Sequence, residues 1–201
     1  TPVAELTGVV NCIVRREDQL VGENTEGQAF LEVLRRTVDP AGKHIVLLGA
    51  GEMARAIGVE LALAGAAEIL VVGQDEPAAN ELVDLIVGNS ETSASFVAWE
   101  DEYLVPAQTD VLVNAPSAEV DDPDSPLPLD LGETTEGICL VDTTVDPPDT
   151  WLIQEAQQRG AASVDGLEMY IQQALINFKL WTDVDAEPTV IREAVEEFLE
   201  L

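Results

Sequence analysis

The chain has 201 residues, and 46% of them are hydrophobic, which is enough to form a buried core and excludes disorder for most of the sequence. Acidic residues outnumber basic ones by 39 to 9, so the formal net charge of −30 disfavours nucleic acids and membrane surfaces as partners. No apolar run reaches the roughly 18 residues of a spanning helix, and no basic and apolar leader is visible, so we expect a soluble, cytoplasmic protein with an acidic, solvated surface.

The first 38 residues predict a β-hairpin followed by a helix. Two β-rich runs, 9–16 and 19–21, flank a polar turn, and residues 27–38 have helical spacing with Asn24 or Thr25 as N-cap. The chain starts in what resembles the end of a helix. We therefore expect residues 1–38 to be the remnant of an incomplete substrate-binding lobe.

Short β-rich runs alternate with helical stretches over residues 39–165. Strands are predicted at 44–48, 69–72, 93–97, 110–114, 138–142 and 161–164, and helices at about 52–64, 77–88 and 149–159. The runs IVLL, ILVV and VLV do not alternate with polar residues, as expected for strands that helices cover on both faces. The pattern predicts an α/β, doubly wound, parallel Rossmann-type sheet, with a long loop over 117–136.

Two further helices are predicted after the sheet, at 166–181 and 188–199. The first has a broad apolar face, which indicates packing against another element. We expect residues 166–201 to pack back on the substrate lobe, which leaves 39–165 as the dinucleotide-binding domain.

The clearest chemical motif is a glycine-rich loop between the first strand and the following helix. In the pattern G-x-G-x-x-G/A, Gly49 permits the tight turn, Gly51 lets the backbone approach a pyrophosphate, and Ala54 allows the helix to pack closely on the strand. Glu52 is expected to point to solvent, and a turn that serves only packing is the alternative. Residues assigned to cofactor binding are Gly49, Ala50, Gly51, Glu52, Met53 and Ala54.

Asp75 lies in the turn after the second predicted strand, 21 residues after Ala54, near the spacing at which a carboxylate takes the ribose hydroxyls of NAD. The turn holds no Arg or Lys for the 2′-phosphate of NADP. The sequence therefore predicts NAD or NADP as cofactor, with NAD slightly favoured. Alternatively, Asp75 and Glu76 only cap the next helix, which has Pro77 in its first turn.

The remaining reactive residue types do not form a known site. Cys12 and Cys139 have no metal-ligand spacing, and the single histidine, His44, begins an apolar strand. We predict no metal site, no disulfide framework and a structural role for His44.

Five motifs in this order resemble the shikimate dehydrogenase family. They are GVVNCI at 8–13, LVGENTEG at 20–27, GAGEMARAI at 49–57, DVLVNA at 110–115, and DGLEM at 165–169 with QQA at 172–174. The ending resembles forms fused to 3-dehydroquinate dehydratase, which implies possible fusion to or association with such a domain. The resemblance implies an NAD(P)-dependent oxidoreductase of aromatic amino-acid biosynthesis that interconverts 3-dehydroshikimate and shikimate. The family's Ser-rich substrate motif and catalytic lysine have no counterpart in these residues.

The resemblance also implies roles for individual side chains. Asn11 and Gln173 match positions that bind the ring hydroxyls of the substrate, and Glu26 stands where the family has a catalytic Asp that works with the lysine. The extra methylene of Glu26 alters the placement of the carboxylate, on which catalysis depends. Further cofactor contacts are implied at Asn114, Ala115, Gly166 and Met169.

Two function classes remain open at this point. The family turn NRT that binds NADP is Gly73, Gln74 and Asp75 here, and neither Lys43 nor Lys179 lies in a motif like that of the catalytic lysine. The chain is therefore expected to be a shikimate dehydrogenase-like oxidoreductase whose activity alone is in question. The alternative is a non-catalytic Rossmann-type regulatory or scaffold protein derived from that family.

Overall fold

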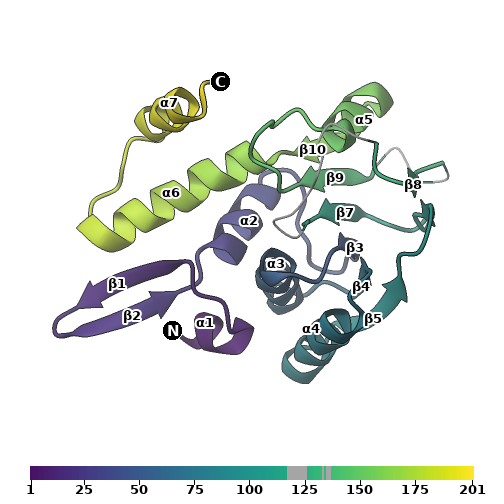
Figure 1. Ribbon diagram of the computed structural model, residues 1–201, viewed down its shortest axis with the longest axis horizontal. Coiled ribbons are helices and arrows are strands. Elements are labelled where there is room, and N and C mark those ends of the chain that lie inside the picture. Colours follow the sequence, from purple (N-terminus) through teal and green to yellow (C-terminus); the bar gives the residue numbers. More distant parts are fainter. Residues whose placement is uncertain (117–125, 133, 135–136) are drawn as a thin grey trace.

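A six-stranded parallel sheet forms the centre of the computed structural model, which describes residues 1–116, 126–132, 134 and 137–201 (Figure 1). Its strands lie in the order β10-β9-β7-β3-β4-β5. Their bounds are β3 His44–Leu48, β4 Glu68–Gly73, β5 Ser93–Ala98, β7 Val111–Asn114, β9 Cys139–Asp142 and β10 Ala162–Val164. The predicted Rossmann-type sheet is confirmed.

The strand order changes direction between β3 and β7. From β3 the chain proceeds outward to β4 and β5, and it then returns to β7 and continues to β9 and β10 on the other side. Leu48 pairs with Val72 on one side and with Asn114 on the other, so the carboxyl ends of these strands form one edge. In open α/β sheets, ligands bind at this reversal point.

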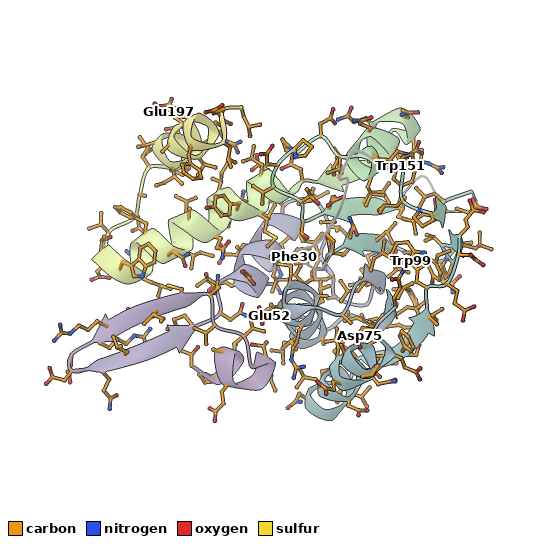
Figure 2. All side chains as sticks on the ribbon, in the orientation of Figure 1. Phe30, Glu52, Asp75, Trp99, Trp151 and Glu197 are labelled. Atoms are coloured by element: carbon orange, nitrogen blue, oxygen red, sulfur yellow. The ribbon has the colours of Figure 1, made fainter. Side chains whose placement is uncertain are left out.

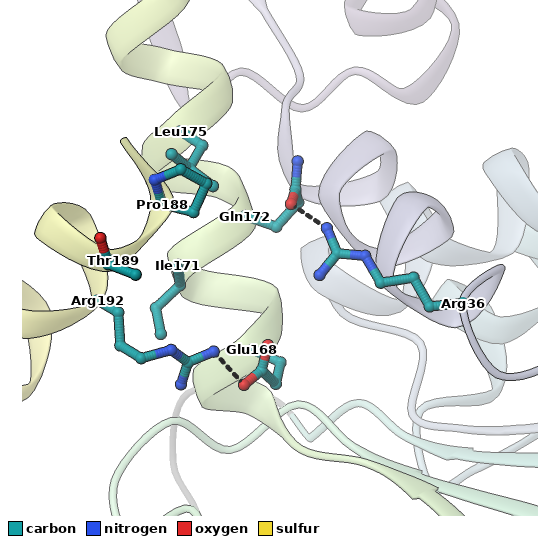
Figure 3. Close-up of a pocket in the computed structure, with 8 residues that line it drawn as sticks. All are labelled: Arg36, Glu168, Ile171, Gln172, Leu175, Pro188, Thr189 and Arg192. Carbon is teal, nitrogen blue, oxygen red and sulfur yellow. Dashed lines mark hydrogen bonds and ion pairs between the residues drawn. The ribbon is translucent and has the colours of Figure 1, made fainter. Parts of the chain in front are cut away.

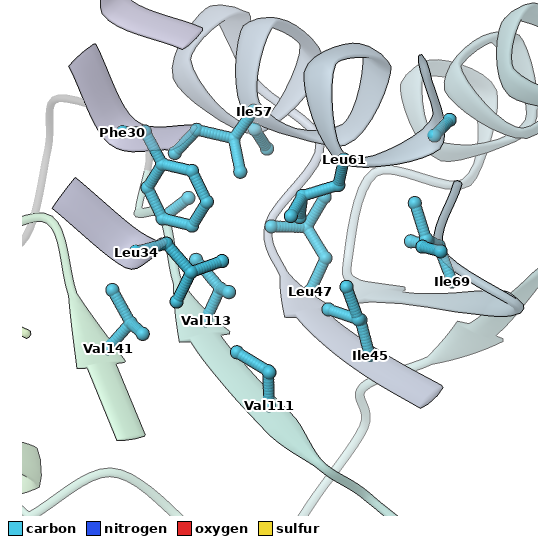
Figure 4. Close-up of a cluster of buried hydrophobic side chains, with 14 of the residues drawn as sticks. Phe30, Leu34, Ile45, Leu47, Ile57, Leu61, Ile69, Val111, Val113 and Val141 are labelled. Carbon is cyan, nitrogen blue, oxygen red and sulfur yellow. The ribbon is translucent and has the colours of Figure 1, made fainter. Parts of the chain in front are cut away.

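Helices cover both faces of the sheet, and this explains the continuous apolar runs. On one face, α2 (Glu26–Leu34), α3 (Glu52–Leu63) and α4 (Glu76–Asn89) share a core cluster with the sheet (Figure 4). The residues labelled there are Phe30, Leu34, Ile45, Leu47, Ile57, Leu61, Ile69, Val111, Val113 and Val141. On the other face, α5 (Trp151–Arg159) packs through Leu152 and Ala156 on Val46, Leu48 and other strand residues.

The terminal segments form the predicted hairpin and helices. After α1 (Pro2–Thr7), strands β1 (Cys12–Arg16) and β2 (Gln19–Glu23) pair in antiparallel orientation. Helix α6 (Gly166–Thr182) packs against α2 and β1, and α7 (Pro188–Leu199) packs on α6. The Trp181 indole donates a hydrogen bond of 3.2 Å to the Ile13 carbonyl, which ties the end of α6 to the hairpin.

Some boundaries differ from the prediction. Helix α2 ends at Leu34 rather than at 38, because the amides of Arg36 and Thr37 bond to carbonyls three residues back and tighten the chain into turns. The predicted loop 117–136 contains a two-residue strand, β8 (Leu129–Asp130), which pairs with β6 (Tyr103–Leu104). Residues 117–125, 133 and 135–136 of that loop lie outside the described residues.

No helix in the described ranges is long and apolar enough to cross a membrane. The division into units at residues 38 and 165 stays a prediction, although Phe30 and Leu34 of α2 belong to the same core cluster as the sheet.

Candidate functional site

The glycine-rich loop, residues 49–54, lies at the reversal point of the sheet, and we call it the cradle. Gly49 has a φ of 105°, and a Cβ atom there would lie 2.3 Å from the Ala115 carbonyl oxygen. The Ala115 amide donates to the Leu48 carbonyl at 3.0 Å, which holds the two loops together. Ala54 is fully buried where α3 meets the sheet. Position 49 therefore requires glycine, both for its positive φ and for the close approach of the Ala115 carbonyl.

Glu52 and Asp75 begin the two helices next to this cradle (Figure 2). Glu52 is exposed, as predicted, in the first turn of α3. The Asp75 side chain accepts a hydrogen bond of 3.1 Å from the Ala78 amide, and it is thus the N-cap of α4. The alternative capping role of Asp75 is observed, and the ribose contact stays a prediction.

A cation that the sequence analysis missed lies between α3 and α4. The Nη1 atom of Arg55 is 3.5 Å from the Glu81 Oε2 atom, and its Nε atom is buried with no hydrogen-bond partner among the described residues. The segment GAGEMAR contains this arginine, but nothing in the local sequence indicates that it faces α4.

Glu26, the candidate catalytic carboxyl group, begins α2 near the start of α3. Burial raises its pKa, the charge of Glu52 raises it further, and the side chain of Gln173 on α6 opposes the shift. Gly27 permits this arrangement, since a Cβ there would lie 2.6 Å from the Ala56 carbonyl oxygen of α3. The structure thus brings Glu26 close to Gln173 and to Glu52 of the glycine-rich loop, and the catalytic and substrate-binding roles of Glu26 and Gln173 stay predictions.

Asn11 joins the hairpin to α2 and α6. Its Oδ1 atom accepts from the Thr25 amide at 2.8 Å, and its Nδ2 atom donates to the Thr25 hydroxyl at 2.9 Å. The Thr25 hydroxyl in turn donates to Asn177 Oδ1 at 2.8 Å. Asn24, the other candidate cap, accepts from the Gly27 amide at 3.2 Å. These bonds fix the segment that carries Glu26.

Asn114 belongs to a buried polar network at the ends of β7 and β9. Its Nδ2 atom donates to Asp142 Oδ2 at 3.1 Å, and the Thr150 hydroxyl donates to the same oxygen at 3.0 Å. The other Asp142 oxygen accepts from the Thr144 amide at 3.0 Å. Asp142 and Thr150 were not singled out from the sequence, since only contacts across the sheet reveal this role.

Gly166 and Met169 have packing roles at the start of α6. A Cβ at Gly166 would lie 2.2 Å from the Thr144 carbonyl oxygen, and Met169 is buried in the core cluster beside the sheet. Their contact with a cofactor stays a prediction.

The two lysines and the histidine interact with aspartates. Lys43 Nζ is 3.1 Å from Asp110 Oδ1, and the backbone amide of His44 donates to Asp110 at 2.9 Å, beside the amino end of β3. Lys179 Nζ is 3.0 Å from Asp185 near the end of α6.

Cys12 and Cys139 are buried free thiols, and burial raises the pKa of Cys139 to about 11. Within residues 1–116, 126–132, 134 and 137–201, no group of three or more His, Cys, Asp or Glu side chains could hold a metal ion.

A separate cavity of about 320 Å³ lies between α6 and α7 (Figure 3). Its two arginines are already engaged, because Arg36 donates to Gln172 and Arg192 pairs with Glu168. The other lining residues are Ile171, Leu175, Pro188 and Thr189. None of the predicted site residues lines this cavity, so it is not part of the candidate site.

The chain is similar to known proteins in both sequence and fold. The profile of the family described as "Shikimate 5'-dehydrogenase C-terminal domain" matches residues 166–196. The "Shikimate dehydrogenase (NADP(+))" of Desulforamulus reducens is 34% identical over 96% of this chain and 68% of its own length. The ligand-free 5-ketofructose reductase of Gluconobacter sp. strain CHM43 has 38% identity and a TM-score of 0.91, covering 98% of this chain and 71% of that one.

A third relative was solved with ligands. Shikimate 5-dehydrogenase from Listeria monocytogenes, in complex with shikimate and NAD, superimposes with a TM-score of 0.86 at 25% identity, covering 97% of this chain and 70% of that one. The fold, the ordered motifs and these similarities lead to one conclusion: the chain belongs to the shikimate dehydrogenase family of oxidoreductases.

Proposed function

We propose that the chain acts in the nicotinamide-dependent reduction of a small polyhydroxylated ketone, with 3-dehydroshikimate and shikimate as the substrate pair. The observation that carries this proposal is the meeting of Glu26 and Gln173 beside the glycine-rich cradle, although they come from distant parts of the sequence. The names of the relatives, shikimate dehydrogenase and 5-ketofructose reductase, support a substrate of this class.

The cradle fits a dinucleotide. The tight turn at Gly49, the free amides at the start of α3 and the open end of β4 at Gly73 suit a pyrophosphate and an adjoining ribose. When bound there, the cofactor would supply the hydride that reduces the carbonyl carbon. We place NAD ahead of NADP because Asp75 and Glu76, at the end of β4, would repel a 2′-phosphate.

The chain's own groups would handle the proton and orient the substrate. Glu26 is suited to hold a proton and to give it to the carbonyl oxygen, because burial and the charge of Glu52 raise its pKa. Gln173 lies beside it and would hydrogen-bond a ring hydroxyl. Asn11 would contribute from the hairpin, where its bonds to Thr25 fix its orientation.

Residues 1–38 and 166–201 would supply part of the substrate lobe on this proposal. The chain spans about 68 to 71% of the length of the relatives described above. A non-catalytic scaffold is a second candidate, which the positions of Lys43 and Lys179 favour, since both are paired with aspartates. Location in the cytoplasm and association with a 3-dehydroquinate dehydratase domain stay predictions.

Calorimetric titration of the whole chain with NAD and NADP tests the proposal. Gly49→Ala should weaken binding of both by at least about tenfold, since its Cβ would clash with the Ala115 carbonyl oxygen and displace the glycine-rich loop. Gly65→Ala is the matched control, because Gly65 also has a positive φ, of 88°, but a Cβ there meets nothing within 4 Å. Equal binding by wild type and Gly49→Ala would refute the cradle.

Absence of all cofactor binding by the wild-type chain would favour the scaffold. NADP binding tenfold tighter than NAD binding would refute the cofactor preference. A spectrophotometric assay with shikimate should show no turnover by this chain alone, since neither lysine lies beside Glu26. Turnover near about 1 s⁻¹, which is in the usual enzyme range, would show that the site is complete.

A further inference from the structure

Positive charge is almost absent from the half of the sheet that would hold the adenosine of the cofactor. The sequence has no Lys or Arg between Arg55 and Arg159. Beyond the first turns of α3, the elements β4, α4 and β5 on this side of β3 therefore contribute no cationic side chain. Arg55 is the one cation that this region offers to an anionic group.

Arg55 lies in the first half of α3 and faces α4, the helix that follows the turn where a 2′-phosphate would be recognised. It belongs to the second half of the GAGEMAR segment, and side chains on a helix lean toward its N-terminus, here toward the cradle. Its contact with Glu81 places the guanidinium between α3 and α4, and the N-cap of α4 is Asp75, two residues after the end of β4. In this class of fold, the end of the second strand recognises the ribose 2′ position.

The hydrogen-bonding capacity of Arg55 is only partly used. Its Nε atom is buried and finds no acceptor in the described part of the chain. Its contact with Glu81 is long, at 3.5 Å, and the Glu81 side chain is 72% exposed, so water screens the pair. A guanidinium whose Nη atoms have only this weak, exposed partner is suited to exchange it for a phosphate.

We propose that Arg55 is the residue that admits NADP to this site, and that Glu81 limits that binding by competing for the guanidinium. The inference rests on the proposed binding of a nicotinamide dinucleotide at the cradle. It assigns the balance between the two cofactors to a pair of residues on α3 and α4, outside the turn at Asp75. NAD lacks the 2′-phosphate, so neither residue affects its affinity.

Four variants of the whole chain test the proposal by calorimetric titration at one ionic strength. Arg55→Gln should weaken NADP binding by about tenfold or more and change NAD binding by less than about twofold. Glu81→Gln should tighten NADP binding by about threefold or more without affecting NAD. Arg15→Gln, on the hairpin, and Glu91→Gln, beyond the far end of α4, make the same changes in net charge and should leave both affinities unchanged.

Competition experiments with adenosine 2′,5′-bisphosphate and with 5′-AMP isolate the contribution of the 2′-phosphate. Arg55→Gln should weaken the binding of the bisphosphate and leave the binding of 5′-AMP unchanged. An Arg55→Gln variant that binds NADP like the wild type, or that loses NAD equally, refutes the role of Arg55. Unchanged NADP affinity in Glu81→Gln refutes the competition. If the wild-type chain binds neither NAD nor NADP, the proposed function itself is refuted. The wild-type titrations therefore distinguish a failure of the proposed function from a failure of the role of Arg55.

Discussion

Gly27 is the residue at which a single methyl group should disturb both the fold and the site. A Cβ there would lie 2.6 Å from the Ala56 carbonyl oxygen and 2.7 Å from Glu60 Cγ, both on α3. The Glu60 side chain can rotate away, but a backbone carbonyl inside a helix cannot. Gly27→Ala must therefore push α2 away from α3, together with the adjoining Glu26.

The expected size of the effect follows from two opposing contributions. Replacing a helical glycine by alanine gains about 0.5–1 kcal/mol through lower backbone entropy in the unfolded chain. Overpacking in a closed interface costs about 1–3 kcal/mol. Because the clash involves backbone, we expect a net loss of about 1–2 kcal/mol, which in a chain of this size lowers Tm by about 2–8 °C.

Gly88→Ala is the matched control. Gly88 is also helical and lies exposed in the last turn of α4, and a Cβ there would have nothing within 4 Å. The same substitution there should raise the free energy of unfolding by up to about 1 kcal/mol. Urea unfolding followed by circular dichroism at fixed salt measures both. If Gly27→Ala stabilises the protein as Gly88→Ala does, the close approach of α2 and α3 is wrong.

Three further outcomes are expected. Burial and the charge of Glu52 raise the pKa of Glu26 in the folded state above its unfolded value, so its contribution to stability is lost as pH rises through the folded pKa. Glu26→Gln should accordingly raise Tm at pH 8 and change it little at pH 4, and equal shifts at both would contradict the reasoning. Thr150→Val removes a hydrogen-bond donor from buried Asp142, so it should lower the free energy of unfolding in urea titrations by about 1–3 kcal/mol. In the control Thr189→Val, at an exposed position, the free energy of unfolding should change by less than about 0.5 kcal/mol. Between 0.01 and 1 M salt the Debye length falls from about 30 to 3 Å, so salt should screen the repulsion within this chain of net charge −30. Tm should therefore rise in NaCl and in KCl alike. A fall in Tm, or a rise with one cation only, would contradict this explanation.

The sheet could be predicted from the sequence because its strands are buried on both faces. Runs such as IVLL at 45–48 are apolar throughout, and a turn and an amphipathic helix follow them. The type and the order of these strands and helices were therefore evident from the sequence. The boundaries of the central strands were wrong by one residue at most at either end. The pair β6 and β8 was missed, because two residues are too few for a periodic pattern.

The candidate site was less predictable because several of its residues act through distant contacts. Thr25 was considered only as a helix cap, yet its hydroxyl bonds to Asn177, which is 152 positions away. Asp142 is the last residue of a predicted strand, and only the sheet reveals that Asn114 and Thr150 bond to it. A motif gives the local backbone, whereas these partners depend on which strands become neighbours.

The large negative charge and the binding of an anionic cofactor are compatible because they act over different ranges. Repulsion from surface carboxylates extends over about one Debye length and is screened by salt. The groups that would hold a pyrophosphate are backbone amides at Gly51 and Glu52, at the start of α3, which act at hydrogen-bond distance and carry no net charge. A chain with this composition can therefore keep a cradle built from glycine while removing almost every cation around it. The 2′-phosphate of NADP is different, because it requires a cation. Arg55 is the one arginine in this region, so it should largely determine how well NADP binds relative to NAD.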